Sequence, residues 1–153
     1  MTITLYWEDF EVGGMAEYGP RLVTAEDIKS FAAEFDPQPM HLDEATARAT
    51  MMGGLCASGW HTCCLMMRIA ADGFILRSSS MGSPGVDEVK WLAPVRPGDQ
   101  LIVRVHVRDK RASHSRPEMG FVKFLFEVVT TAGVLVMTLS TSLMFGRRGG
   151  ALS

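Results

Sequence analysis

One apolar stretch, residues 60–76, constrains the fold of this chain more than any other feature. On a helix that begins after Ser58, apolar side chains would cover almost the whole circumference. The polar ones would fall on one narrow stripe formed by His61, Arg68 and Asp72. A helix that is apolar nearly all round must be surrounded by protein. The stretch is too short and too charged to span a membrane, so we expect a central, buried helix.

Two shorter helices are predicted before this one. Thr24 has the character of an N-cap followed by acidic residues in the first turn, so a helix should begin there. It should end near Phe35, because Pro37 disfavours the helical conformation for the residue before it. A second helix is expected over residues 43–50, with Asp43 as its cap.

The second half of the chain has the patterns of β-strands. In residues 101–108, an apolar residue at every second position indicates a strand with one buried and one wet face. Further β-rich runs are residues 86–92, 121–131 and 134–145, the last two joined by a hairpin signal, and an edge strand is expected at residues 15–23. A curved antiparallel sheet wrapped around the apolar helix is the simplest way to bury both. We therefore expect one α+β domain over residues 1–153.

Composition narrows the classes of function. The chain has 153 residues, of which 47% are apolar, enough for one core without a disulfide or a metal. A net charge of −2 with no basic run argues against nucleic-acid binding. Cys56, Cys63 and Cys64 form no disulfide or zinc pattern, so we interpret them as reduced core thiols. Acidic residues stand where a signal peptide needs a basic and then an apolar run, which indicates a cytoplasmic protein without a membrane partner.

One loop has a composition suited to acid–base chemistry. Asp36 and His41 lie five residues apart, and Pro37 and Pro39 stiffen the chain between them, so the two side chains would be pre-positioned. Apolar neighbours such as Phe35 would partly desolvate Asp36, and desolvation raises the pKa of a carboxyl and makes it a better general base. The alternative is structural: Asp36 caps a turn and His41 caps the next helix.

A second candidate is the start of the apolar helix, at Ser58 and Gly59. A helix N-terminus offers unpaired N–H groups and the positive end of a dipole, which suit an oxyanion or a polarised thioester carbonyl. Gly59 would let a ligand approach the backbone closely. The alternative is that Ser58 only caps the helix and Gly59 only allows tight packing.

These motifs together resemble the MaoC-like (R)-specific enoyl-CoA hydratase family over nearly the whole chain, residues 6–145. The resemblance rests on an Asp-x-x-Pro-x-His segment at residues 36–41, on the Ser58-Gly59 step, and on the Val-Arg-Pro-Gly-Asp turn at residues 95–99. It implies a hot-dog fold, in which the sheet wraps the long helix, assembled as a homodimer or a higher homo-oligomer. It also implies fatty acid metabolism, with water added to or removed from C2–C3 of an acyl-CoA. Coenzyme A would then enter as part of the substrate, and no separate cofactor is expected.

The resemblance further implies a role for each matching residue. Asp36 and His41 match the catalytic pair that holds and activates one water, and the N–H of Gly59 matches the donor to the thioester carbonyl. The family usually has Asn where this chain has Gln38, and His-Gly where it has Ser58-Gly59, so both departures lie beside the predicted chemistry. We expect Gln38, Ser58 and Gly59 to bind substrate. Two alternatives stay open, an acyl-CoA thioesterase on the same fold and an acyl-CoA-binding module without turnover.

Other polar residues are weaker candidates. We expect His61 to pack as a polar core residue, His106 to face solvent on its strand, and Arg116 to lie in a solvated loop rather than on a coenzyme A phosphate. No third ligand accompanies His41 and Asp43 at a helpful spacing, so no metal site is predicted. No nucleotide-binding glycine motif is present. The eleven methionines are core filler or the adaptable wall of an acyl tunnel.

Overall fold

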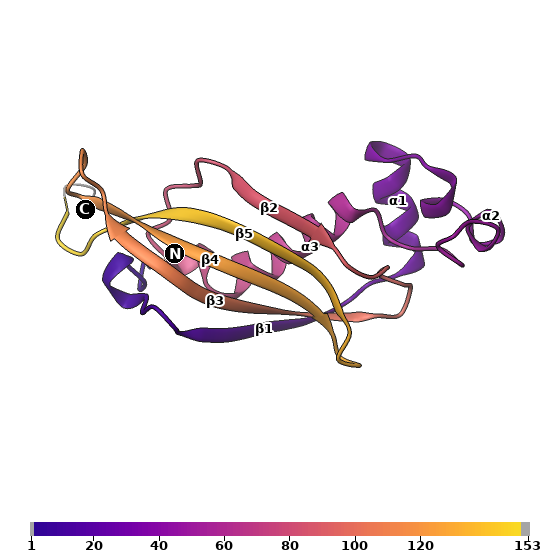
Figure 1. The fold of residues 1–153 in the computed structure, drawn as a ribbon, viewed down its shortest axis with the longest axis horizontal. Coiled ribbons are helices and arrows are strands. Elements are labelled where there is room, and N and C mark those ends of the chain that lie inside the picture. The colour runs from indigo at the N-terminus through magenta and orange to yellow at the C-terminus, as the bar shows by residue number, and fades with distance from the viewer. Residues whose placement is uncertain (1, 151–153) are drawn as a thin grey trace.

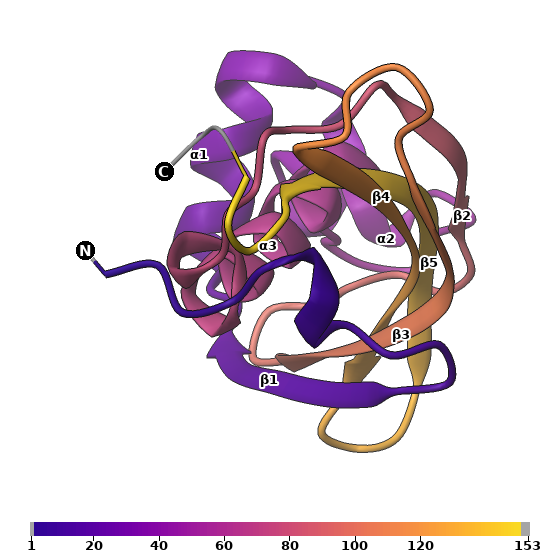
Figure 2. The ribbon, with the colours of Figure 1, turned by 90° about the vertical axis from the view of Figure 1, so that its left-hand side faces the viewer.

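A curved antiparallel sheet wraps around one long helix in the computed structural model, which describes residues 2–150 (Figures 1 and 2). The helix is α3 (Gly59–Gly73). The strands, in the spatial order β1-β3-β4-β5-β2, are β1 (Met15–Leu22), β3 (Gln100–Ala112), β4 (Met119–Thr130), β5 (Leu135–Gly146) and β2 (Val86–Trp91). This is the α+β hot-dog fold that the sequence predicted.

The remaining helices are short. They are α1 (Ala25–Phe35), α2 (Glu44–Arg48) and three 3-10 turns, η1 (Trp7–Asp9), η2 (Pro39–His41) and η3 (Ile75–Arg77). Ile28 of α1 belongs to the hydrophobic core cluster. Both predicted caps are confirmed. Thr24 Oγ1 accepts from the N–H of Asp27 at 3.1 Å, and Asp43 Oδ2 accepts from the N–H of Thr46 at 2.8 Å. In Figure 1, α1 and α2 lie beyond the strands, at the end of the molecule where α3 begins.

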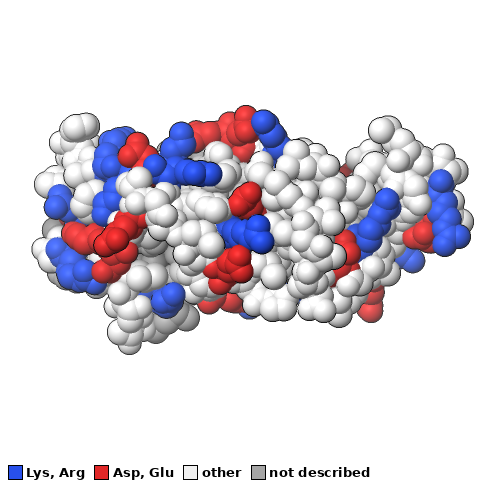
Figure 3. Space-filling view, turned by 60° about the horizontal axis from the view of Figure 1, so that its bottom comes forward, with Lys and Arg blue, Asp and Glu red and all other residues white. Residues whose placement is uncertain are grey.

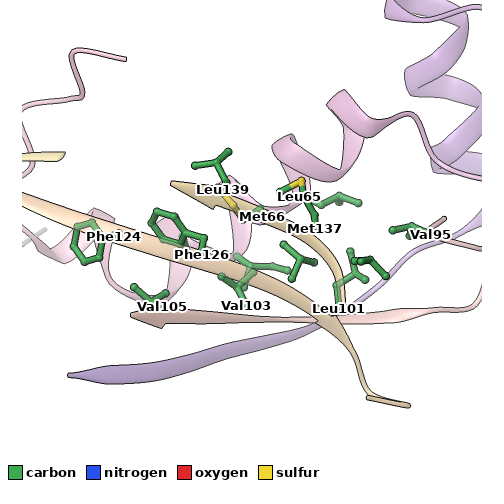
Figure 4. Packing of buried hydrophobic residues seen from close by; sticks show 14 of the residues in the cluster. Leu65, Met66, Val95, Leu101, Val103, Val105, Phe124, Phe126, Met137 and Leu139 are labelled. Carbon is green, nitrogen blue, oxygen red and sulfur yellow. The ribbon is translucent and has the colours of Figure 1, made fainter. Parts of the chain in front are cut away.

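The hydrophobic core lies between α3 and the concave side of the sheet. Leu65 and Met66 of α3 face the sheet side chains Phe124, Phe126 and Met137 (Figure 4). Each of these side chains is almost fully buried. Burying a side chain of this size contributes about 1.5–3 kcal/mol, so the contact of the helix with the sheet contributes strongly to stability.

Helix α3 is nevertheless not covered on all sides, so the prediction of a surrounded helix is wrong for one face. Trp60 is 61% exposed and Met67 45% exposed, because the sheet covers only the opposite side of the helix. The three residues of the predicted polar stripe also differ in their exposure to solvent. His61 is buried, whereas Arg68 and Asp72 are exposed and form an ion pair with each other at 3.0 Å.

The strand predictions are confirmed in type and in approximate extent. Along residues 101–107 of β3, buried and half-buried side chains alternate as the period of two predicted. The hairpin between β4 and β5 turns at Gly133, whose φ of +91° is in the region that favours glycine. Strands β1 and β2 form the two edges of the sheet.

The surface mixes charges of both signs. On the face shown in Figure 3, basic and acidic side chains are interspersed rather than gathered by sign. Several form ion pairs, such as Arg104 with Glu17 at 3.0 Å. Within residues 2–150, no helix combines the length and the apolar character that crossing a membrane requires.

The three cysteines are free thiols in different surroundings. Cys56 is buried and Cys63 partly buried, but Cys64 is exposed on the uncovered face of α3. The interpretation of all three as core thiols is therefore wrong for Cys64. The cause is the same as for Trp60: the apolar pattern of a helix does not tell which of its faces the sheet covers.

Candidate active site

Asp36 and His41 meet just beyond the C-terminal end of α1. The helix ends with the N–H of Asp36 donating to the carbonyl of Ala32 at 2.9 Å. The turn η2 then brings His41 back, so that its Nε2 lies 3.5 Å from Oδ2 of Asp36. The N–H of His41 donates to the carbonyl of Gln38 at 2.9 Å and fixes this turn. Both side chains line the same cavity.

The orientation of the His41 ring follows from one backbone carbonyl. His41 is only 4% exposed, and its Nδ1 lies 2.7 Å from the carbonyl oxygen of Cys56. Because a carbonyl oxygen can only accept, the proton of the neutral ring sits on Nδ1. The Nε2 lone pair is therefore directed toward Asp36 and is free to accept a proton.

The carboxylate of Asp36 receives one hydrogen bond on each oxygen. The hydroxyl of Ser58 donates to Oδ2 at 2.6 Å, and the side-chain amide of Gln38 donates to Oδ1 at 2.7 Å. The Ser58 bond is the main reason why the pKa of Asp36 lies below its usual range. Partial burial opposes it, and Gln38 and the nearby His41 add to the lowering. Asp36 is thus an oriented anion at neutral pH.

The prediction of a raised pKa at Asp36 is therefore wrong. It assumed that apolar sequence neighbours would desolvate the carboxyl, but Phe35 is 65% exposed and Pro37 and Pro39 are exposed too. These residues project into solvent, while the polar donor Ser58 comes from a distant part of the chain.

The start of α3 contributes a backbone donor and a closely packed glycine. Ser58 stands at the N-cap position, but its hydroxyl donates to Asp36 and makes no capping hydrogen bond, so the alternative that Ser58 only caps the helix is wrong. The N–H of Gly59 finds no acceptor among residues 2–150, and Gly59 lines the cavity. A Cβ there would lie 2.5 Å from Cε2 of Trp91, whose Nε1 donates to the Gly59 carbonyl at 2.9 Å. Packing against Trp91 therefore requires a glycine at this position.

The cavity beside the pair has a volume of about 530 Å³, within the usual range for small-molecule sites. Gln38 lies on its wall, so the amide that holds Asp36 is also at the cavity surface. The other walls are mainly apolar: Met40, Met51, Met52, Ala57, Trp60, Thr62, Trp91, Leu92, Ala93, Pro94, Val95 and Val136. No lysine or arginine in the described part of the chain lines it. The site thus places two polar groups beside a wall suited to an apolar chain, with three methionines that can adapt to its shape.

Two contributors to the site were missed in the sequence. The first is the carbonyl of Cys56, which orients His41 and, being a backbone group, has no sequence signature. The second is Arg96, noted only as part of a turn, whose guanidinium donates to the carbonyl of Gly54 at 2.7 Å. Arg96 and Gly54 are 42 positions apart in the sequence, so no local signal indicated this contact.

The weaker candidates lie away from the pair. His61 is buried and stacks on Phe31 with ring centroids 4.6 Å apart, so it packs in the core as expected. His106 lies on the half-buried face of β3, with its side chain 25% exposed and its Nε2 in contact with Glu127 Oε1, so the prediction that it faces solvent is confirmed only in part. Arg116 is exposed and pairs with a glutamate of its own loop. Across residues 2–150, no three His, Cys, Asp or Glu side chains gather as a metal ion would require.

One protein family and several known proteins are similar to this chain. Residues 11–123 match the family described as MaoC like domain. The chain is 28% identical over 140 residues to the uncharacterized protein YdeM of Bacillus subtilis (strain 168), a match that covers 92% of this chain and 98% of that protein. It is similar to a MaoC-like dehydratase from Rhodospirillum rubrum (TM-score 0.88, 38% identity, 95% of this chain and 99% of that one). It is also similar to the R-hydratase PhaJ1 of Pseudomonas aeruginosa (TM-score 0.76, 26% identity, 94% and 87% covered).

Proposed function

Because the chain belongs to the MaoC-like dehydratase family, we propose that it is a hydro-lyase acting on acyl-CoA thioesters. It would add water to the C2–C3 double bond, as an (R)-specific enoyl-CoA hydratase, or remove water as a 3-hydroxyacyl-CoA dehydratase. The observation that carries this proposal is the meeting of Asp36 and His41, 3.5 Å apart, on the wall of an apolar cavity that also contains Gly59. The similarity to an R-hydratase supports the same reaction class.

In the hydration direction, the pair holds one water by its two hydrogens. Oδ2 of Asp36 and Nε2 of His41 are both acceptors, and a carboxylate has about four lone-pair sites, so the bonds from Ser58 and Gln38 leave room for the water. As the water oxygen bonds to C3, the pair takes up the proton that the water loses. A proton is then delivered from the pair to C2 on the same face, which completes the addition.

The start of α3 would polarise the thioester. Negative charge develops on the carbonyl oxygen as C3 is attacked, and the N–H of Gly59 is the donor that would stabilise it, aided by the positive end of the helix dipole. Losing one such donor typically costs about 2.7–4 kcal/mol of transition-state stabilisation. Because Gly59 also lines the cavity, the carbonyl and the reacting double bond would lie within reach of the same pair.

The wider context is also part of this proposal. The acyl chain would be apolar, since the cavity wall offers it no cation. Coenzyme A would be part of the substrate rather than a bound cofactor. We expect a homodimer or a higher homo-oligomer, which would cover exposed apolar side chains such as Trp60 and Met67, and a cytoplasmic role in fatty acid metabolism.

The test is the absorbance of the enoyl-thioester band with purified protein and trans-2-enoyl-CoA substrates from short to long. Loss of the band without release of free thiol is the expected result, and the best chain length measures the usable cavity. Asp36→Asn and His41→Ala should each abolish hydration while the folded state survives. The amide of asparagine can still accept a hydrogen bond but cannot take up the proton that the water loses, and alanine removes the Nε2 acceptor. Near-full activity in either variant would contradict the assigned roles.

The same assay separates the two alternative functions. Release of free thiol from acyl-CoA would identify a thioesterase, in which the activated water attacks the carbonyl instead of C3. Tight binding of coenzyme A esters with no change in absorbance and no thiol release would identify a binding module. Either of these results, if found across the whole substrate panel, would refute the proposal that the protein is a hydro-lyase.

A further inference from the structure

We infer that Arg96 is a positioning residue for the proposed reaction, acting on His41 and Asp36 through the backbone of residues 52–58. This inference rests on the proposed function for its kinetic consequence. Its structural part, the control of the His41 tautomer, stands on its own. Arg96 does not line the cavity, so it touches no reacting group.

The guanidinium of Arg96 binds a run of backbone carbonyls. It donates to the carbonyl of Gly54 at 2.7 Å and to that of Met52, with a longer contact to that of Leu55 at 3.4 Å. Arg96 itself is fixed within its turn, because its N–H donates to the carboxylate of Asp99 at 2.8 Å. A rigid turn therefore presents a cation to a segment that has no helix or strand of its own.

Glu44 holds the same segment through a second contact. Its Oε2 accepts the N–H of Leu55 at 2.9 Å. A Cβ on Gly54 would lie 3.3 Å from both Glu44 Oε1 and a guanidinium nitrogen of Arg96, so the two charged side chains close tightly around that glycine. Two opposite charges on one short segment satisfy its carbonyls and an N–H together, which fixes its path.

The residues that follow the segment held by Arg96 and Glu44 make the contacts that orient the proposed catalytic pair. The carbonyl of Cys56 accepts from Nδ1 of His41 at 2.7 Å, and the hydroxyl of Ser58 donates to Asp36 at 2.6 Å. Between them, the N–H of Ala57 donates to the carbonyl of Val95, the residue before Arg96, at 2.9 Å. The turn of Arg96 thus anchors the segment both before the run that meets the pair and in the middle of that run.

This geometry requires an arginine rather than any cation. A planar guanidinium can donate to several carbonyls at once, whereas the ammonium of a lysine is a compact charge that would keep one of them. A shift of residues 54–56 would carry the Cys56 carbonyl away from His41. The neutral ring would then no longer be held with its proton on Nδ1. A displacement of about 1 Å at a reacting group can cost on the order of 100-fold in rate.

The experiment compares Arg96→Met, Arg96→Lys and the control Arg48→Met by two readouts. Arg48 is a matched control, because it pairs with the same Glu44 at 3.0 Å but donates to no carbonyl of residues 52–55. The first readout is the ¹⁵N spectrum of the imidazole of His41, assigned with His41→Ala, which reports the tautomer without any substrate. The second is hydration of the best trans-2-enoyl-CoA, with kcat and KM measured separately across pH.

Arg96→Met should mix the His41 tautomers and lower kcat by about 10- to 100-fold with little change in KM. Arg96→Lys should lie between it and the wild type, and Arg48→Met should match the wild type in both readouts. A lowered melting temperature with a wild-type tautomer signal and a wild-type kcat would overturn the inference, since Arg96 would then be only structural. If Arg96→Met fails to fold, a wild-type spectrum and kcat for Arg96→Lys overturn it equally. Failure of the proposed function is distinguishable, because an inactive wild-type protein still yields the tautomer result.

Discussion

Substituting alanine for Gly59 should destabilise the protein, although alanine is the better helix former. A Cβ at this position would lie 2.5 Å from Cε2 of Trp91, 2.7 Å from its Nε1 and 2.8 Å from its Cδ2, and these three atoms are its nearest neighbours. Real atoms do not approach so closely, so the indole of Trp91 must move away. Since Trp91 is 47% exposed, it can do so toward solvent.

The cost of this movement can be estimated from the contacts that Trp91 would lose. Its hydrogen bond to the Gly59 carbonyl contributes about 1 kcal/mol. Its edge-to-face contact with Trp60, at 5.2 Å between ring centroids, contributes about 0.5–1.5 kcal/mol. The helix preference of alanine over glycine returns roughly 0.5–1 kcal/mol. We therefore expect a net loss of about 0.5–2 kcal/mol in the free energy of unfolding, or roughly 1–8 °C in melting temperature.

Denaturant and thermal unfolding of Gly59→Ala, Trp91→Ala and the double variant test this account. Because the three atoms nearest to this Cβ all belong to Trp91, the alanine at position 59 should cost little once the indole is removed. Gly85→Ala is the matched control, since a Cβ there would meet nothing within 4 Å. If Gly59→Ala is as stable as the wild type, or equally destabilising with and without Trp91, the packing argument is refuted.

Two further predictions follow from the charges of the site and the core. Ser58→Ala removes the 2.6 Å donor to Asp36, so we expect kcat/KM to fall about 10- to 100-fold, because a hydrogen bond to a charged group contributes about 1.5–3 kcal/mol. It should also raise the pKa of Asp36 and move the acid limb of the rate–pH profile to higher pH, and an unmoved limb would contradict the cause given for the lowered pKa. Burial lowers the pKa of His61 below its usual 6.5, so the unfolded state binds its proton first and stability is lost as the pH falls below about 6.5. In chemical unfolding between pH 7 and pH 5, the free energy of unfolding of His61→Leu should fall less with decreasing pH than that of the wild type. An equal fall in both proteins would refute this prediction.

Local signals in the sequence predicted most of the fold. Thr24 and Asp43 cap their helices as expected, because a cap depends on residues three positions away. The strands were found by their period of two, which reflects one buried face. What covers an apolar face is not a local property, however, so the exposed side of α3 at Trp60 and Met67 could not be read from the helix itself.

The candidate site was predicted in its members but not in its electrostatics. Asp36 and His41 could be paired from one stiff loop, because only five residues separate them. The direction of the pKa shift at Asp36 depends instead on Ser58, 22 positions away in the sequence, whose hydroxyl reaches the carboxylate only after α3 has packed. The orientation of His41 depends on the backbone carbonyl of residue 56, and every type of amino acid at that position has the same carbonyl.

The two departures from the family pattern, Gln38 and Ser58, converge on the same carboxylate. Each supplies a hydrogen-bond donor to a different oxygen of Asp36, at 2.7 Å and 2.6 Å. Together they keep the acid ionised and fix its plane, while its remaining lone pairs stay available toward His41. A change that removed turnover by disabling the acid would leave one of these oxygens without a donor or turn it away from the histidine. The departures therefore give no support to a site that has lost its chemistry, and they favour an oriented anion beside an imidazole whose Nε2 can accept a proton.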